Sequence, residues 1–366
     1  MDKAIYFSGL NGIRTIAALA VVFSHINNRL HYYGVPNLPL LDIANFGVTI
    51  FFTLSGFLIT YLLLEEKEKT GTIALKKFYW RRVLRIWPLY FFYLIVVILF
   101  NDPSTLQWAI LFFVFMVPNF RNSFKETINT VPGSHHLTYM IGHYWSLGVE
   151  EQFYLFWPLL VKKLKSILIF ACVFPLIFIV FKLILKVTQA PDGWLTFFHY
   201  TRFGCLVIGA LGAYWVKYQY QSILTFFTKP IVDLCCWLFL LFLSFNQFHI
   251  ASIIDHEIVA FVTLGIIFNQ VVNPRPLINL EQPWLDFLGK ISFGLYVYNP
   301  LVIYLVALGL KDFDFGSIYL RYVLIYGTTI AVLIVVSFVS YQFLEKKFLK
   351  LKSKFTVVPS FSSKLH

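Results

Sequence analysis

Ten long apolar runs, spread over almost the whole chain, constrain its fold more than any other feature of the sequence. Each run approaches the roughly 20 residues that a helix needs to cross a hydrocarbon core of about 30 Å. Within lipid every backbone amide needs a partner inside the protein, and a helix supplies these partners from its own backbone. The runs lie at residues 8–28, 43–64, 86–101, 144–161, 166–187, 203–218, 230–248, 257–272, 290–310 and 319–343. The sequence therefore predicts an all-α fold, a polytopic membrane helix bundle of about ten transmembrane helices.

The composition supports a membrane protein and excludes several other classes. Of the 366 residues, 58% are hydrophobic and 13% are charged, whereas a soluble domain carries roughly 25% charged residues. Such a chain has too little polar surface for a soluble, disordered or fibrous protein. All four cysteines lie within apolar segments, which indicates buried small side chains rather than a disulfide framework.

The distribution of basic residues predicts how the helices are oriented. If the chain starts inside and crosses ten times, 21 of the 30 Lys and Arg residues face the cytoplasm, 7 face outward and 2 lie within spans. This is the positive-inside pattern of membrane proteins, and it explains the net charge of +12 without nucleic acid as a partner. The first apolar run has no small-residue cleavage site, so we expect a retained helix rather than a signal peptide. We therefore expect an integral protein of the cytoplasmic (inner) membrane with both termini cytoplasmic.

A shorter apolar stretch at residues 108–117 is flanked by prolines and has half the length of a span. It predicts one short re-entrant or interfacial segment, because a further full crossing would turn the later basic loop and the basic tail outward. Most loops are short. We therefore expect a single membrane domain over residues 1–350, followed by a flexible, basic cytoplasmic tail at residues 351–366.

Arg14 and His25 are ionisable residues within the first apolar run, where lipid makes a charge costly. They are eleven residues apart, a spacing that returns to within about 20° on a helix and rises about 16 Å. One interpretation leaves Arg14 at the inner headgroups and His25 at the outer interface. The other is a shared polar path, with His25 as a general base or acyl acceptor and Arg14 as a cation for an anionic ligand.

Arg81, Arg82 and Arg85 stand just before the third apolar run, at positions i, i+1 and i+4. This spacing puts Arg81 and Arg85 on one helix face, with Arg82 one turn from Arg85. Arginines at this boundary commonly bind the anionic headgroups of membrane lipid. The alternative is a clamp for the phosphates of a nucleotide-like donor, because guanidinium groups match phosphate geometry.

A third polar group precedes and enters the run at residues 144–161. It contains three histidines and two carboxylates, but His135 and His136 lie in a loop and no His-x-x-x-His spacing occurs, so no metal site is expected. Glu150 lies near the outer end of the predicted span, at the level inferred for His25. It is expected to orient the imidazole or to stabilise its cation, unless it or Glu151 serves as a helix cap.

These segments, taken in order, resemble the motifs of acyltransferase family 3, the integral membrane sugar O-acyltransferases. The motifs are GLNGIRTIAALAVVFSH, FFTLSGFLIT, RRVLRIWPLY, YWSLGVEEQFYLFWPL, ISFGLYVYNPLV and YQFLEKKF, and they cover about residues 8–348. The resemblance implies a ten-helix acyltransferase domain that moves an acyl group from acyl-CoA at the cytoplasmic face to a hydroxyl of an envelope or lipid-linked carbohydrate. Acetyl-CoA is the expected donor substrate, with no permanently bound cofactor and no metal.

The resemblance also implies roles for single residues. Arg14, His25 and Glu150 would be catalytic, and Arg82 and Arg85, with Arg81 beside them, would bind the acyl-CoA. The chain departs from the family pattern at Asn299, where members commonly have His. It also departs at Lys346, where they commonly have Pro after the late Glu. Some members carry an additional hydrolase-like domain outside the membrane, and none is expected within these 366 residues.

Two questions stay open on the sequence. A carrier that moves a glycolipid or a small solute without bond chemistry is the alternative function, although the chain has no paired repeats of the kind that transporters often contain. The acyl group could pass directly to the acceptor or through an acyl-enzyme. Ser55, Tyr296, Asn299 and Arg14 are candidate donors to the oxyanion. The sequence does not indicate an oligomeric state.

Overall fold

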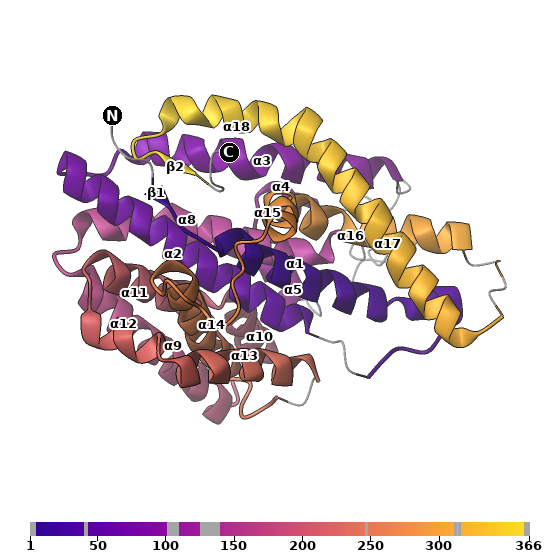
Figure 1. Ribbon diagram of the computed structural model, residues 1–366, viewed down its shortest axis with the longest axis horizontal. Helices are drawn as coiled ribbons and strands as arrows, with labels where there is room; N and C mark the ends of the chain where they lie inside the picture. Colours follow the sequence, from indigo (N-terminus) through magenta and orange to yellow (C-terminus); the bar gives the residue numbers. More distant parts are fainter. Residues whose placement is uncertain are drawn as a thin grey trace.

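The computed structural model of the protein describes residues 5–39, 43–100, 110–124, 140–245, 248–310, 313 and 316–361. Figure 1 shows these residues as a bundle of helices, which confirms the all-α fold. Each of the ten predicted apolar runs contains a helix. These are α1 (Leu10–Asn27), α2 (Ala44–Thr70), α3 (Leu75–Phe100), α8 (Trp145–Lys163), α9 (Ile167–Val187), α11 (Phe203–Lys217), α13 (Pro230–Ser244), α14 (Asp255–Val271), α16 (Ser292–Leu310) and α17 (Ile318–Ser340).

Shorter elements connect and extend these helices. The short α-helices are α4 (Ile110–Val114), α5 (Pro118–Ser123), α10 (Asp192–Thr201), α12 (Gln221–Phe227), α15 (Pro283–Lys290) and α18 (Lys346–Lys352). The single-turn segments are the 3-10 helices η1 (Leu30–Tyr33), η3 (Gly142–Tyr144) and η5 (Ser353–Phe355) and the π-helix η4 (Tyr341–Glu345). The strands are β1 (Ile5–Tyr6) and β2 (Ser360–Phe361).

Five helices of the described chain are long and apolar enough to cross a membrane, so the predicted count of about ten spans is not confirmed. They are α2, α3, α9, α16 and the continuous stretch Ile318–Phe355 that begins with α17. A sixth span results if α12 and α13, which meet at 59°, count as one broken helix. The other predicted spans fall short because α11 and α14 have 15 and 17 residues. In α1 and α8, polar side chains interrupt the apolar sequence.

The predicted re-entrant segment is described only from Ile110 onward. There α4 has five residues and is followed, after Met116 with its positive φ of 56°, by the six-residue α5. Neither helix is long enough to cross a bilayer. His135 and His136 lie outside the described residues.

The centre of the bundle is the crossing of α2 and α11, which lie closely side by side. Glycines make this approach possible. A Cβ on Gly56 would collide with the backbone oxygen of Leu206, and a Cβ on Gly209 would collide with the backbone oxygen of Thr53. Small residues at such crossings let helix backbones approach closely in membranes.

The outer surface of the bundle suits lipid. Large apolar side chains are exposed along α9 and α17, including Leu176, Ile177 and Val335. Lys182 of α9 is one of the two basic residues that the sequence places within spans. It does not face this surface, because its ammonium is buried 2.7 Å from the Glu257 carboxylate of α14. Pairing of this kind is what a buried charge requires.

Both described ends of the chain meet at one side of the bundle. β1 and β2 pair in parallel, and α18 runs along α3 (Figure 1). Residues 351–361, predicted as the start of a flexible tail, include η5 and β2 and lie against the helices. This arrangement places the last residues of the chain next to the cavity described below.

Candidate functional site

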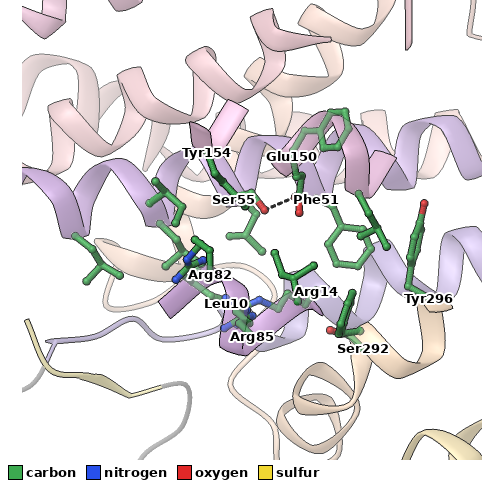
Figure 2. Close-up of a pocket in the computed structure, with 18 of the residues that line it drawn as sticks. Leu10, Arg14, Phe51, Ser55, Arg82, Arg85, Glu150, Tyr154, Ser292 and Tyr296 are labelled. Carbon is green, nitrogen blue, oxygen red and sulfur yellow. Dashed lines mark hydrogen bonds between the residues drawn. The ribbon is translucent and has the colours of Figure 1, made fainter. Parts of the chain in front are cut away.

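A cavity of about 460 Å³ lies among α1, α2, α3, α8 and α16. Its volume is within the range of about 300–1,000 Å³ typical of small-molecule sites. Figure 2 shows arginines at one side of the cavity and Tyr296 at the other. The charged residues in its described lining are Arg14, Arg82, Arg85, Glu150 and Lys352.

Three arginines from two helices line one side of the cavity (Figure 2). Arg82 and Arg85 are three residues apart on α3 and therefore share a face. Arg14 comes from α1, where its Nη1 donates a 2.5 Å hydrogen bond to Asn11 Oδ1. Asn11 Nδ2 in turn donates to Asp286 Oδ1 at 2.6 Å. The bond to Asn11 fixes one edge of the Arg14 guanidinium, and Arg14 lines the cavity.

The described residues leave much of the hydrogen-bonding capacity of these guanidinium groups unused. The Arg82 guanidinium lies 5.7 Å from the ring centres of Phe78 and Tyr154. Its buried Nε has no hydrogen-bond partner among the described atoms. The Arg85 guanidinium forms no hydrogen bond or ion pair with any described residue. Because guanidinium groups match the oxygen geometry of phosphates and carboxylates, the arrangement suits an anionic ligand.

The structure does not bring Arg81 into the cavity with Arg82 and Arg85. Its Nη2 lies 3.2 Å from Glu66 Oε2, and its Nη1 donates to the backbone oxygen of Phe355 at 2.9 Å. The spacing in the sequence puts Arg81 and Arg85 on one face of α3, but the rotation of α3 in the bundle turns Arg82 and Arg85 inward. Arg81 instead ties α3 to α2 and to the end of the chain.

Glu150 of α8 lies in the cavity and accepts a 2.6 Å hydrogen bond from the Ser55 hydroxyl of α2 (Figure 2). The prediction paired Glu150 with His25, but the structure gives the two residues different hydrogen-bond partners. The alternative of a helix cap is wrong for both carboxylates. α8 begins at Trp145 and has no acidic residue in its first turn. Glu151 lies outside the cavity lining and accepts from Trp87 Nε1 at 3.3 Å.

His25 of α1 is held by Asn299 of α16. His25 Nδ1 lies 2.6 Å from Asn299 Oδ1 of α16. The Asn299 amide nitrogen donates to the backbone oxygens of Leu295 and Tyr296 at 3.2 and 2.6 Å, so its oxygen is the atom that faces the imidazole. An amide oxygen only accepts hydrogen bonds, and the proton is therefore assigned to Nδ1. In this tautomer Nε2 is the basic atom of the ring.

The cavity wall is connected to His25 through His143. Ser146 and Tyr296 line the cavity, and their hydroxyl oxygens lie 2.5 Å apart. The Tyr296 hydroxyl donates to the backbone oxygen of His143 at 2.9 Å, and the centres of the His143 and His25 rings are 6.3 Å apart. His143 is buried with 7% of its surface exposed. His143 is the third histidine of the group considered for a metal in the sequence. Its position between the cavity wall and His25 was not predicted, and the available signal was its place directly before the Tyr-Trp-Ser segment.

The described residues contain no group of three or more His, Cys, Asp or Glu side chains that could hold a metal ion. The cavity is rich in cations, which also disfavours a metal there. The arrangement as a whole can bind an anion on arginines, with the His25 imidazole behind the cavity wall.

Comparison with known proteins places the chain in a family. A family model described as "Acyltransferase domain" matches residues 7–342. The chain is 30% identical over 380 residues to "Putative O-acetyltransferase SACOL0978" of Staphylococcus aureus (strain COL), covering 95% of the chain and 58% of that protein. It is 26% identical over 326 residues to "Peptidoglycan O-acetyltransferase OatA" of Listeria monocytogenes, covering 81% and 49%. It is also 26% identical to "O-acetyltransferase OatA" of Staphylococcus aureus (strain NCTC 8325 / PS 47), covering 82% and 51%.

The chain thus spans between about half and three fifths of the length of these curated relatives. No solved structure gives a significant match. The family match extends over nearly the whole chain and includes the ordered motifs around Arg14, His25 and Glu150. The resemblance found in the sequence is confirmed, and the chain belongs to acyltransferase family 3.

Proposed function

We propose that this protein is a membrane O-acyltransferase that moves an acetyl group from cytoplasmic acetyl-CoA to a hydroxyl of an envelope or lipid-linked carbohydrate. One observation carries the proposal. A cavity with four cations and one carboxylate in its described walls is connected to His25 through Tyr296 and His143. Relatives named as O-acetyltransferases, one of them acting on peptidoglycan by its name, support acetyl as the group and an envelope glycan as the acceptor.

The donor site is the arginine side of the cavity. Coenzyme A carries phosphate groups at one end and the thioester at the other, so a cationic cavity suits its phosphates. Arg82 and Arg85 bind the phosphates, and the acyl arm extends toward Ser146 and Tyr296. The positive-inside distribution of Lys and Arg supports a cytoplasmic position for this end of the bundle, where acyl-CoA is found.

The chemical step uses His25 as a general base. Its Nε2 removes the proton of the acceptor hydroxyl while that oxygen attacks the thioester carbonyl, which forms a C–O bond. The C–S bond then breaks, and the CoA thiolate leaves with the proton returned by the imidazolium. A positioned base of this kind contributes about 10²–10⁴-fold to a rate. Asn299 supports the role because it holds the tautomer in which Nε2 is basic.

The hydrogen bonds of the site reduce the candidates for stabilising the oxyanion. The Ser55 hydroxyl donates to Glu150, the Tyr296 hydroxyl donates to a backbone oxygen, and the Asn299 amide donates to two. Arg14 has five N–H donors, of which one bonds to Asn11. Arg14 therefore retains donors, but it lies about 16 Å from His25 along α1. Its donors suit the phosphate end of the cavity rather than an oxyanion beside His25.

A two-step route uses the same residues. In that case His25 Nε2 attacks the thioester itself, CoA leaves, and the acceptor hydroxyl then takes the acetyl group from the imidazole. Acid quenching after incubation with labelled acetyl-CoA and no acceptor distinguishes the routes. Label retained on the protein supports the acyl-enzyme, and unlabelled protein supports direct transfer.

Purified protein incubated with labelled acetyl-CoA and candidate glycans tests the function. We expect CoA release that depends on the acceptor, with label in the glycan. His25→Ala should abolish transfer, while His31→Ala, which changes an exposed histidine just beyond α1, should retain it. Full activity in His25→Ala would remove the catalytic assignment. Movement of a glycolipid without CoA release would instead support the carrier.

A further inference from the structure

The end of the chain forms part of the cavity wall. We call residues 349–361 the C-terminal strap. Four of its residues line the cavity, namely Leu349, Lys352, Ser353 and Thr356. Beyond them, β2 pairs in parallel with β1, and Ile5 of β1 also lines the cavity. The strap is therefore fastened at its far end to the start of the chain.

A second attachment holds the middle of the strap against α3. Arg81 Nη1 donates to the backbone oxygen of Phe355 at 2.9 Å. The Phe355 ring stacks on Trp80 with a centroid distance of 5.9 Å. Arg81 is itself anchored by Glu66 of α2, whose surface is 1% exposed. The position of Lys352 at the cavity is thus set by two attachments that follow it in the strap.

We infer that the C-terminal strap completes the donor site, with Lys352 as a binding residue for the phosphates of the donor and the strap closed over them. The inference rests on the proposed function and adds to it a residue and a wall that lie beyond residue 348, where the last of the family motifs ends. Arg81 is then a positioning residue, because it contacts the strap rather than the ligand.

The charge of the cavity supports this assignment. The Lys352 ammonium, like the Arg85 guanidinium, forms no hydrogen bond or ion pair with any described residue. The described lining contains four cations against the single carboxylate of Glu150. Like charges gathered in a site of low dielectric repel each other. The arrangement becomes favourable when a ligand with several negative charges binds, and the phosphates of an acyl-CoA donor meet this requirement.

Anionic lipid headgroups have the same phosphate chemistry and are abundant at a membrane surface. The strap and β1 contribute to the cavity lining beside the arginines. A lipid headgroup lacks the thioester that the proposed reaction consumes, and this favours the acyl-CoA donor. The experiment nevertheless includes an arm for each source.

Binding of CoA to the purified full-length protein, in detergent free of anionic lipid, tests Lys352. Lys352→Ala should raise the Kd for CoA about tenfold, in keeping with the loss of one charge-assisted contact. Lys350→Ala and Lys354→Ala change exposed lysines of the same segment that do not line the cavity, and they should leave Kd unchanged. Lys352→Arg should restore most of the affinity. Thermal unfolding of each variant reports whether the fold is retained.

Closure of the strap has its own readout. In a background without the exposed Cys172 and Cys235, Ser353→Cys should react with a maleimide more slowly when CoA is present. An unchanged labelling rate would overturn closure.

The outcomes separate this inference from the proposed function. If wild-type protein binds CoA and Lys352→Ala behaves like Lys354→Ala, the role of Lys352 is wrong and the function stands. If wild-type protein binds no CoA, both are wrong. If the Lys352→Ala effect requires vesicles containing phosphatidylglycerol, the ligand is a lipid headgroup and the inference is overturned.

Discussion

The pairing of His25 with Asn299 gives the chain a base of defined tautomer without the second histidine that its family commonly has. Asn299 is fully buried, and its amide nitrogen is occupied by two backbone oxygens. It can therefore present only its oxygen to His25. The departure from the family pattern preserves an acceptor for Nδ1–H, and this is the property that a basic Nε2 needs.

Asn299→Leu should lower kcat with little change in the KM for acetyl-CoA, because it removes the acceptor for Nδ1–H and leaves the cavity arginines intact. We expect a loss of about 10–100-fold, the range found when the partner that orients a histidine is removed. The measurement is steady-state kinetics with acetyl-CoA varied at saturating acceptor. Asn299→His, which introduces the common family residue, should retain activity. Equal kcat in Asn299→Leu and wild type would contradict the orienting role.

Glu150→Gln should separate donor binding from turnover. The substitution keeps an acceptor for Ser55 but removes the only negative charge in the described cavity lining. Donor binding should become several-fold tighter, because a lost negative charge strengthens the attraction for phosphate, while turnover falls. Glu151→Gln alters the neighbouring carboxylate outside the lining and serves as the control. Calorimetry with CoA and a transfer assay on the same preparations give both quantities, and weaker binding in Glu150→Gln would contradict the prediction.

The sequence identified most of the charged cavity residues because ionisable groups in apolar runs are rare. Arg14 and Glu150 were found in this way, Arg82 and Arg85 were found as a cluster just before such a run, and all four line one cavity. Spacing along α3 could not decide which arginines face inward, because packing against neighbouring helices sets the rotation of the helix. The level of Glu150 in its span likewise did not reveal that it meets Ser55 rather than the His25 ring.

At the scale of the element, the crossing of α2 and α11 sets the width of the bundle beside the cavity. Ser55 precedes Gly56 on α2, so the residue that bonds Glu150 is adjacent to the residue that permits the crossing. A shift of α2 away from α11 would move Ser55 and the cavity wall with it. Packing of the two helices and the geometry of the site are therefore linked through consecutive residues.

Gly56→Ala should destabilise the protein and lower its activity. The added methyl group would collide with the backbone of Leu206, which has no flexible side chain to move away. Overpacking of this kind costs about 1–3 kcal/mol. Gly309→Ala on α16 is the matched control, because a Cβ there meets nothing within 4 Å and alanine favours a helix. Thermal unfolding in detergent should show a lower Tm for the first variant alone, and equal Tm values would contradict the close crossing.

The positions of the helices could be predicted from the apolar runs, since each run contains one. Which helices are apolar enough to count as spans could not be predicted in the same way, because side chains at the site interrupt the apolar sequence. Asn11, Arg14 and His25 reduce the hydropathy of α1, and Glu150 and Glu151 do the same in α8. The contacts of the C-terminal strap could not be predicted from the sequence for a different reason. Its contacts with β1 and α3 connect residues far apart in the sequence, and no local pattern reports them.

At the scale of the whole molecule, the predicted ten-span topology makes four positions alternate across the membrane. Cysteines are introduced at His31, Lys163, Gln189 and Lys354, which are all exposed, in the background without Cys172 and Cys235. An impermeant maleimide added to intact cells should label positions 31 and 189 and leave 163 and 354 unlabelled until the membrane is opened. Outward labelling at both 163 and 354 would contradict this topology and indicate a full crossing between α3 and α8.

Donor binding should also depend on salt, because the cavity cations act together. The affinity of wild-type protein for CoA should fall as ionic strength rises, since salt screens the attraction between guanidinium and phosphate. Arg82→Ala and Arg85→Ala should weaken binding at low salt and show a smaller further loss at high salt. Titrations over a range of sodium chloride concentrations provide the test. A salt dependence equal to that of wild type would argue against phosphate contacts at these residues.

The cavity takes one wall from α1, among the first residues of the chain, and another from the strap, among the last. Membrane proteins are inserted as they are synthesised, so Arg14 is in place long before Lys352 leaves the ribosome. The cavity consequently cannot take its described form before residues 349–356 have been synthesised. A chain cut short before them would carry Arg14, Arg82 and Arg85 without the wall that the strap provides.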